Sequence, residues 1–366
     1  MTRALALFSG SLASRVAARV VARQVDELFL LHFRSPFFAD SGPLRELVKE
    51  EWPGVPLRTQ SLKKEYRRMA NIPPRGSFAL TRSCLSCRTI ILMRAARYME
   101  RLKADFIVTG EIAGQRGLSA DDLTRIDEAL GITGLVLRPL SAHLLPPTQA
   151  ERVGWVERKH LFGLKEHDSP LLPEIAARLG IVADGDPFSA EMRCKLTFPG
   201  FGARLESLLT EEHFNLNAIR LLDFRLYYRC PPDVKIVLAA TEEEKRALQD
   251  LLLPQDLRVY LPTYPGPMAM VRTNWLKKTA FEVRKIVELA GRIAATHSSA
   301  PPGTLIPVSF RFERDDETSQ LNVLPFSSPA AIEEYCTLYA VEFPDRGSGC
   351  TVRDDDSYPT PVSSRR

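Results

Sequence analysis

The sequence has little excess charge of either sign and no long hydrophobic run. Among 366 residues, 49 basic and 45 acidic side chains leave a formal net charge of +4. This balance lacks the strong positive field of an obligate DNA-binding protein, although it permits RNA binding. No stretch approaches the ~18–20 apolar residues that span a bilayer. We therefore expect neither a DNA partner nor a membrane association.

Internal repeats are also missing, and the first eleven residues, 1–11, lack a charged leader and a small-residue cleavage site. They are apolar and run into a helical pattern, which predicts a buried first strand and not a signal peptide. We therefore expect a cytoplasmic protein. In a reducing cytosol the six cysteines are expected to be thiols, metal ligands or catalytic groups, and not structural disulfides.

The composition divides the chain into segments. An apolar fraction of 45% and a charged fraction of 26% are ordinary for globular proteins, and 366 residues exceed one ordinary domain. We predict a first domain over residues 1–210, a second over 211–344, and a tail, 345–366, whose low apolar content predicts disorder.

Strand and helix patterns alternate through the first segment. Strands are predicted over 4–8, 27–33, 56–61, 105–109 and 135–139, and helices over 12–24, 44–51, 86–103, 155–161, 171–179 and 201–209. This alternation predicts a doubly wound parallel α/β sheet, whose ligands bind at the carboxyl ends of the strands.

The second segment changes to several strands and two helices. Strands are predicted over 219–228, 235–239, 258–261, 268–272, 305–312 and 321–325, with helices over 242–252 and 276–295. The pattern is typical of a second, smaller α+β domain.

A loop of small residues, 8–14, joins the first strand to the first helix. A helix N-terminus presents backbone N–H groups and a positive dipole end, and the hydroxyls of Ser9, Ser11 and Ser14 add donors, so the loop is a candidate phosphate site. It matches no Walker A or dinucleotide pattern. An ordinary turn with serine caps is an equal interpretation of these residues.

A C-x-x-C motif, Cys84 and Cys87, stands at the start of a predicted helix between Arg82 and Arg88. A helix N-terminus and basic neighbours lower a thiol pKa, which favours a nucleophilic cysteine. The pair is also compatible with half of a metal or iron–sulfur site. Two buried cysteines that pack as small apolar groups are the alternative, and we favour a functional role.

Two further loops follow predicted strands. Residues 109–116 are polar and contain two glycines, so they are candidates to hold a nucleotide, with a mobile loop as the alternative. In the segment 138–148, Arg138 and His143 are candidates to face an anion, although a lone histidine is more often an ordinary polar loop residue.

Together these motifs resemble the short tRNA 4-thiouridine synthases of the thiamine-biosynthesis type, members of the PP-loop ATP pyrophosphatase superfamily. The resemblance covers residues 1–210 and follows the order of the phosphate loop 9–14, the C-x-x-C helix, T-G-E-x-x-G-Q-R at 109–116, R-P-L-S-A-x-L-L-P-P-T at 138–148, G-W-V-x-R at 154–158, and Cys194. It implies a PP-loop fold of the adenine nucleotide alpha hydrolase type.

The resemblance also implies a mechanism in which ATP, with Mg²⁺, adenylates a tRNA uridine and a sulfur species then displaces AMP. The matching nucleotide-binding positions are Ser9, Gly10, Ser11, Ser14, Thr109, Gly110 and Gln115. Cys84, Cys87 and Cys194 match the sulfur-handling positions, either as persulfide carriers or as ligands of a [4Fe–4S] cluster. A sulfur donor protein or sulfide would supply the sulfur.

The phosphate loop departs from the family pattern at two positions. Ser11 replaces a glycine and Ala13 replaces an aspartate, which narrows the space beside the backbone and removes a carboxylate from the helix N-terminus. A catalytically degenerate paralogue that acts as an RNA-binding or scaffold protein is therefore an alternative. Another PP-loop chemistry, such as amidation of a small metabolite, is a third.

The second domain is similar to the NFACT-type RNA-binding module, in residues 235–244 and 265–267. This resemblance implies an RNA partner. The predicted helix 276–295 carries a row of basic residues that we expect to contact phosphates: Lys277, Lys278, Arg284, Lys285 and Arg292.

Overall fold

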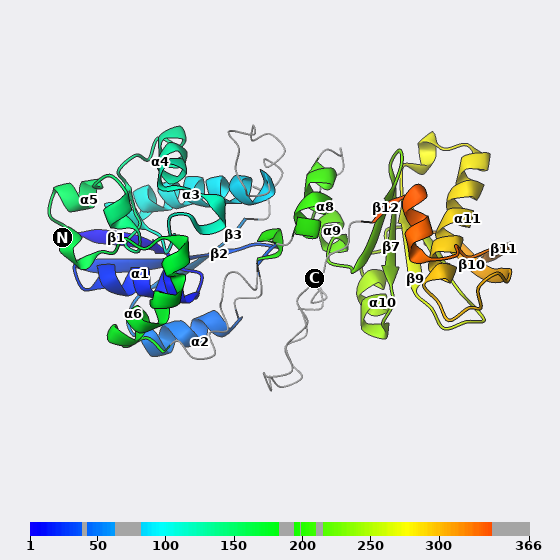
Figure 1. Cartoon of the computed structure of the whole chain (residues 1–366), viewed down its shortest axis with the longest axis horizontal. Coiled ribbons are helices and arrows are strands. Elements are labelled where there is room, and N and C mark those ends of the chain that lie inside the picture. The colour runs from blue at the N-terminus through cyan, green and yellow to red at the C-terminus, as the bar shows by residue number, and fades with distance from the viewer. Residues whose placement is uncertain (39–41, 63–81, 183–193, 198, 210–214, 339–366) are drawn as a thin grey trace. The chain divides into compact units, whose positions relative to one another are not determined.

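The computed structural model describes residues 1–38, 42–62, 82–182, 194–197, 199–209 and 215–338. The chain divides into two compact units, Met1–Thr197 and Phe198–Arg366 (Figure 1). Among the helices that the structure describes, none combines the length and the apolar composition that a membrane-spanning segment requires. The tail 345–366, predicted to be disordered, lies outside the described residues.

The first unit is a doubly wound α/β domain, as the sequence predicts. Its strands are all parallel and lie in the order β3-β2-β1-β4-β5. They are β1 (Arg3–Leu7), β2 (Glu27–Arg34), β3 (Leu57–Ser61), β4 (Phe106–Val108) and β5 (Val136–Leu137). The chain adds strands on one side of β1 and then on the other. The direction of winding therefore changes between β1 and β4, which is where such sheets bind ligands.

Helices cover both faces of this sheet (Figure 1). On one face α1, α2 and α6 bury apolar side chains against alternate residues of β1, β2 and β4, and on the opposite side lie α3 and α4. The helices of this unit are α1 (Leu12–Ala22), α2 (Gly42–Glu51), α3 (Arg82–Leu102), α4 (Ala120–Ala129), α5 (Gln149–Arg152) and α6 (Leu172–Arg178). Short 3₁₀ helices are η2 (Gln115–Gly117), η3 (Ala142–Leu144), η4 (Arg158–His160), η5 (Glu166–Leu171) and η6 (Lys195–Thr197).

Two helix predictions in this unit need correction. The predicted helix 155–161 contains only the 3₁₀ turn η4. The Arg158 side chain of this turn donates a hydrogen bond to the carbonyl of Ala142 in the preceding motif. Helix α4 was not predicted, although Ser119 and Asp122 form a capping box at its start, a signal that was visible in the sequence.

The second unit is a smaller α+β domain, also as predicted. Its sheet has the order β11-β10-β8-β9-β7-β6-β12, and every neighbouring pair is antiparallel. The strands are β6 (Leu226–Cys230), β7 (Val234–Ala239), β8 (Leu257–Tyr260), β9 (Met268–Arg272), β10 (Ile306–Phe312), β11 (Ser319–Val323) and β12 (Thr337–Leu338). The helices are α8 (Pro199–Leu209), α9 (Leu216–Leu221), α10 (Glu242–Gln249) and α11 (Ala280–Thr296), with 3₁₀ turns η7 (Trp275–Lys277) and η8 (Pro329–Glu334).

Helix α11 packs across one face of this sheet. Its buried residues Ile286, Ala290 and Ile293 join a core with Leu257 and Val259 of β8. Alternate residues of each strand therefore point away from α11, toward the opposite face.

The start of the second unit differs from the prediction. Residues 219–222 were predicted to begin a strand but lie in and just after α9, whose N-cap is the Asn215 side chain. The fully buried Arg204 of α8 donates hydrogen bonds of 2.6–2.8 Å to the carbonyls of Leu222, Phe224 and Arg225. Helix α8 thus groups with the second unit, whereas the sequence placed the domain boundary after residue 210.

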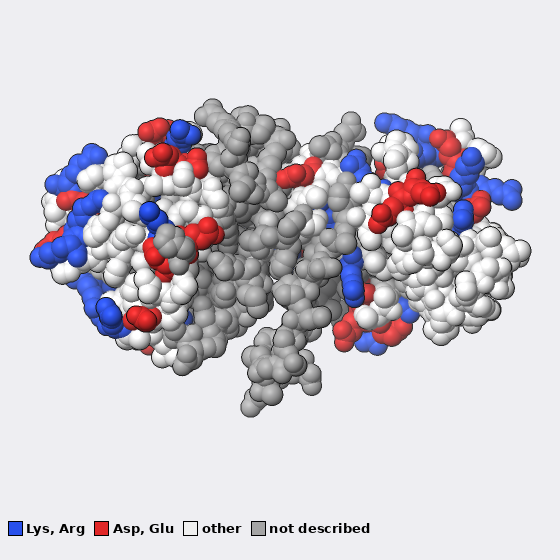
Figure 2. Space-filling model, viewed as in Figure 1, with Lys and Arg blue, Asp and Glu red and all other residues white. Residues whose placement is uncertain are grey.

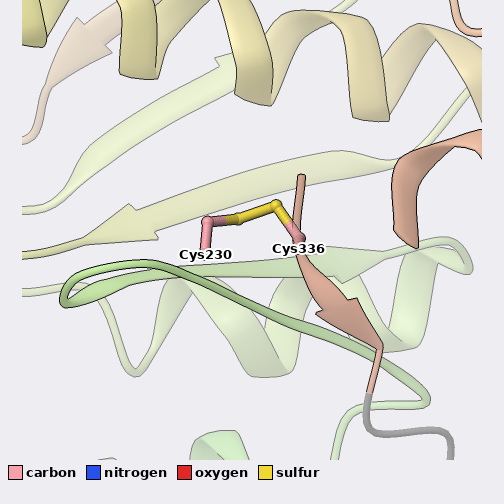
Figure 3. Close-up of a disulfide and its surroundings, with 2 residues drawn as sticks. All are labelled: Cys230 and Cys336. Atoms are coloured by element: carbon pink, nitrogen blue, oxygen red, sulfur yellow. A yellow bond between two sulfur atoms is a disulfide. The ribbon is translucent and has the colours of Figure 1, made fainter. Parts of the chain in front are cut away.

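The expectation that the cysteines form no structural disulfide is wrong for one pair. Cys230 and Cys336 form a disulfide, although they are 106 residues apart in the chain (Figure 3). Strand β12 pairs with β6 in the register Thr337↔Arg229, which places the neighbouring cysteines opposite each other with their Cα atoms 4.2 Å apart. This contact depends on long-range strand pairing, which local sequence patterns do not reveal.

Candidate functional site

The loops that follow β1 and β4 meet at the carboxyl edge of the parallel sheet. Gly110 lies so close to the first loop that a Cβ there would be 2.6 Å from the carbonyl carbon of Ala13 and 2.7 Å from the nitrogen of Ser14. A residue with a Cβ would clash with backbone at this point, so glycine is required for the approach. Two of the predicted nucleotide-binding segments are thus in direct contact.

Three serine hydroxyls form a cluster at the start of α1. The Ser9 hydroxyl lies 2.9 Å from that of Ser11 and 3.3 Å from that of Ser14, and the Ser11 Oγ accepts a hydrogen bond from the Ser14 N–H. Ser9 is exposed, and Gly10 has a φ of 88°, which favours glycine. The hydroxyls and the helix dipole fit a phosphate group. The loop offers no carboxylate to Mg²⁺, because residue 13 is alanine.

A buried ion-pair network anchors the loop after β4. Arg138 donates two hydrogen bonds to Asp127 of α4, at 2.7 and 2.9 Å, and one to Glu111 at 2.7 Å. Arg88 of α3 forms an ion pair of 2.9 Å with the other oxygen of Glu111, and the Thr109 hydroxyl donates to Glu111 at 3.2 Å. The network therefore ties the C-x-x-C helix and the T-G-E segment to each other.

Glu111 and Arg138 hold their charges at neutral pH. Burial disfavours the charged form of Glu111, but Arg88 and Arg138 outweigh this effect and hold the pKa of Glu111 at about 2. Burial acts against the charge of Arg138 as well, and its two carboxylate partners raise the pKa above the ordinary value. Burial raises the pKa of Asp127, which the bidentate contact with Arg138 opposes. Glu111 is therefore a permanent anion and not a proton donor.

Of the two candidates to face an anion, Arg138 is directed at internal carboxylates and not at an external ligand. The Arg138 side chain is 2% exposed, and its donors are directed at Asp127 and Glu111. His143 is exposed, and its Nε2 lies 2.9 Å from the carbonyl oxygen of Arg158. The position of Arg138 at a strand end suggested a ligand contact, but its side chain instead connects Asp127 of α4 to Glu111 inside the domain.

The remaining motif residues also build the framework. The fully buried Ser141 accepts a hydrogen bond from the Ala113 N–H and donates one to the Leu164 carbonyl. Arg158 donates to the carbonyls of Ala142 and Leu145 and pairs with Glu151. The R-P-L-S-A and G-W-V-x-R motifs thus hold neighbouring loops in place behind the edge of the sheet.

The two described cysteines of the first unit are both buried. Cys87 lies early in α3, and Cys194 directly precedes η6, which packs against α3. The Lys195 N–H donates to the Phe37 carbonyl at 2.9 Å, so this segment also lies beside the chain that leaves β2. The helix that carries Cys87 thus contacts the turn that directly follows Cys194.

The third predicted cysteine, Cys84, belongs to α3, but its side chain lies outside the described residues. In the described part of the chain, no three His, Cys, Asp or Glu side chains gather in a way that could hold a metal ion. The three-cysteine site and the [4Fe–4S] cluster therefore stay predictions, as does the role of Gln115, which begins the turn η2.

His32 was missed by the sequence reasoning. It is buried on β2, and its Nδ1 lies 2.9 Å from the carbonyl oxygen of Phe8, the residue before the serine loop. Burial lowers the pKa of His32 and outweighs its contact with that carbonyl. A neutral imidazole thus supports the loop from the neighbouring strand. A histidine within an apolar strand pattern was the available signal.

The basic residues around α11 are not equivalent. Lys278 is 7% exposed and pairs with Asp233, and Arg292 donates to the Leu324 carbonyl. These two stabilise the fold, so the expectation that the whole row faces RNA needs correction. Exposed basic side chains remain at Lys277, Arg284 and Lys285. Figure 2 shows lysine and arginine side chains gathered over the end of the unit that contains α11.

Residues 227–336 match the model of the NFACT protein RNA binding domain family. The match lies within the second unit and covers α11 and the sheet from β6 to β11. No curated protein matches the chain.

Several solved structures are similar to parts of the chain. The C-terminal part of the fibronectin/fibrinogen-binding protein from Streptococcus suis has 13% identity and a TM-score of 0.26, over 52% of this chain and 79% of that one. A 4-thiouridine synthetase in complex with RNA and ATP has 21% identity and a TM-score of 0.33, over 49% of this chain and 53% of that one. The NMN synthetase from Francisella tularensis has 13% identity and a TM-score of 0.25, over 48% and 84%. The match to the 4-thiouridine synthetase thus spans about half the length of that protein.

Proposed function

We propose that the protein is an ATP-dependent tRNA sulfurtransferase, in which the second unit binds tRNA and the first activates and thiolates a uridine. The observation that carries this proposal is the meeting of a serine-rich loop and a T-G-E segment at Gly110. The same unit carries Cys87 on α3, and α3 contacts the turn η6 that directly follows Cys194. The family match of residues 227–336 supports the RNA partner.

The residues divide the reaction between them. Ser9, Ser11 and Ser14 bind the phosphates of ATP beside Thr109 and Gly110. A uridine carbonyl oxygen attacks the α-phosphate, so that pyrophosphate leaves and an adenylated base forms. A sulfur nucleophile then attacks the activated carbon, and AMP leaves with the former carbonyl oxygen.

The cysteines supply the sulfur. Cys87 and Cys194, with Cys84, would either carry a persulfide or hold an iron–sulfur cluster. The persulfide would take its outer sulfur from the persulfide of a donor protein, and release of the thiolated base would leave a disulfide between two of these cysteines that an external thiol reopens. Free sulfide would serve as the sulfur source only in the cluster route. A bound cluster would present sulfur as a nucleophile. The buried positions of Cys87 and Cys194 would protect the sulfur from solvent oxidants.

A second candidate is an RNA-binding protein whose first unit no longer turns over ATP. Ala13 favours it, since no carboxylate of the loop reaches a metal, and so do the serine hydroxyls, which bond to one another. On this account RNA binds in the second unit and the first serves as a scaffold.

The two candidates differ in AMP production. The full chain, with ATP, Mg²⁺ and a sulfur donor, should release AMP and pyrophosphate only when unmodified tRNA is also present. RNA binding without tRNA-dependent AMP would favour the scaffold, and AMP release without any tRNA would favour chemistry on a small metabolite.

A further inference from the structure

The sheet of the second unit has a pocket on the face that α11 leaves uncovered. It has a volume of about 400 Å³, within the range of small-ligand sites. Three cations line it, Lys245 of α10, Arg258 of β8 and Arg311 of β10, together with Tyr260, and none of the described residues that line it is acidic. Leu257 and Val259 of β8 face α11, so Arg258 and Tyr260 project to the opposite side.

Two arginines stand directly opposite each other in this pocket. The antiparallel register of β8 and β10 pairs Arg258 with Arg311, and like charges in that position destabilise a sheet. Glu313 neutralises Arg258 through two hydrogen bonds, at 2.7 and 2.9 Å. Arg311 makes no side-chain hydrogen bond or ion pair within the part of the chain that the structure describes. Its guanidinium is therefore available to an external anion.

The remaining walls of the pocket suit a flat ring. Tyr260 is half-buried and lies two register positions from the arginine pair, on the same face of the sheet, opposite Ser309. Gly266 and Pro267 form the adjoining wall, and a Cβ on Gly266 would lie 2.7 Å from the Ser298 Cβ, so the backbone there is held close to the segment after α11. An aromatic face beside a cation is the combination that binds an unpaired nucleotide through stacking and a phosphate contact.

We propose that this pocket binds one nucleotide of a single-stranded RNA segment, with a base stacked on Tyr260 and its phosphate paired with Arg311. Lys245, which pairs with Glu242 at 2.8 Å, borders the same space and adds a second donor. The inference rests on the proposed RNA binding of the second unit and assigns it to the face opposite α11.

Binding of a single-stranded oligonucleotide to the full chain tests this assignment at several salt concentrations. Arg311→Gln should weaken binding about tenfold and lower the salt slope by about one, because one phosphate contact is lost. Tyr260→Leu should weaken binding about tenfold through lost stacking, with the salt slope unchanged. Arg220→Gln is the matched control, since it removes the same charge from an exposed position on α9, and Arg284→Gln tests α11 as the alternative site.

The outcomes separate this proposal from the proposed function. Arg311→Gln should not lower the melting temperature, because it relieves a like-charge pair. Wild-type binding that neither Arg311→Gln nor Tyr260→Leu changes would overturn the pocket and leave RNA binding intact, and a loss in Arg284→Gln alone would move the site to α11. Equal affinity for duplex RNA would overturn the single-strand assignment. No binding by the wild type at low salt would overturn both proposals.

Discussion

Gly110 and Ala13 are in backbone contact, and this contact joins the two loops that the proposed function assigns to ATP. A Cβ at residue 110 would be 2.6 Å from the carbonyl carbon of Ala13 and 2.7 Å from its oxygen. Backbone cannot move aside as a flexible side chain can. The position of the T-G-E segment therefore depends on a residue without a side chain.

Gly110→Ala should destabilise the first unit by about 1–3 kcal/mol, because the methyl group forces the loops apart. Urea unfolding of the full chain measures this change. Gly54→Ala is the control: nothing lies within 4 Å of a Cβ there, and its positive φ of 81° adds only a local cost of about 1–2 kcal/mol. Gly110→Ala should also weaken ATP binding, and Gly54→Ala should not. Unchanged ATP affinity in Gly110→Ala would separate this contact from the nucleotide site.

Glu111 should make the stability of the first unit depend on acid pH. Its pKa of about 2 lies below the ordinary value of 4.5, so the folded state favours the carboxylate. The resulting stability, roughly 3 kcal/mol, is fully present above pH 4.5 and is lost as the pH falls toward 2. Glu111→Gln should be less stable than wild type at pH 7, and the difference should shrink between pH 4.5 and 2. A difference that stays constant over this range would contradict the assignment.

The sequence predicts the fold of the first unit well because its signals are local. Apolar runs and helical stripes place β1, β2 and α1 within a few residues of their observed bounds. The strand predicted at 219–228 begins instead with α9, because Asn215 caps a helix that its apolar residues did not distinguish from a strand.

The candidate site is less predictable because its residues act through distant partners. Arg138 has the strand-end position of a ligand-binding residue, yet its guanidinium donates hydrogen bonds to Asp127 and Glu111. The Arg88 contact with Glu111 likewise joins residues that no local pattern relates. Motif positions mark two segments that meet at the edge of the sheet, but only the structure distinguishes framework residues from those at that edge.

The Cys230–Cys336 disulfide should stabilise the second unit. It closes a loop of 106 residues, and the entropy that such a link removes from the unfolded chain corresponds to about 4–5 kcal/mol. A reductant should therefore lower the melting temperature of the wild type. The double variant Cys230→Ser, Cys336→Ser should melt at the lower temperature with or without reductant. A wild-type melting temperature that the reductant leaves unchanged would contradict this role.

The serine loop should gain metal-dependent affinity from a carboxylate. Ser11→Gly combined with Ala13→Asp should tighten ATP binding about fivefold when Mg²⁺ is present, through a contact worth on the order of 1 kcal/mol. Without Mg²⁺ the added charge should weaken binding by repelling the phosphates. Ser11→Gly alone, which removes the hydroxyl that caps Ser14, is the control and should not tighten binding. Titration calorimetry that detects no binding by either variant would remove the loop from the nucleotide site.

Mass spectrometry of tRNA nucleosides tests the proposed function most directly. Unmodified tRNA is incubated with the full chain, ATP and Mg²⁺, once with a sulfane-sulfur donor and a thiol reductant and once with sulfide after iron–sulfur reconstitution. The tRNA is then digested and analysed, with Cys87→Ser and Cys194→Ser variants in parallel. We predict a thiolated uridine, 16 mass units heavier than uridine as expected for exchange of oxygen by sulfur, whose formation needs ATP and is lost in both variants. Unmodified nucleosides, together with tRNA that binds normally, would contradict the sulfurtransferase and leave an RNA-binding protein.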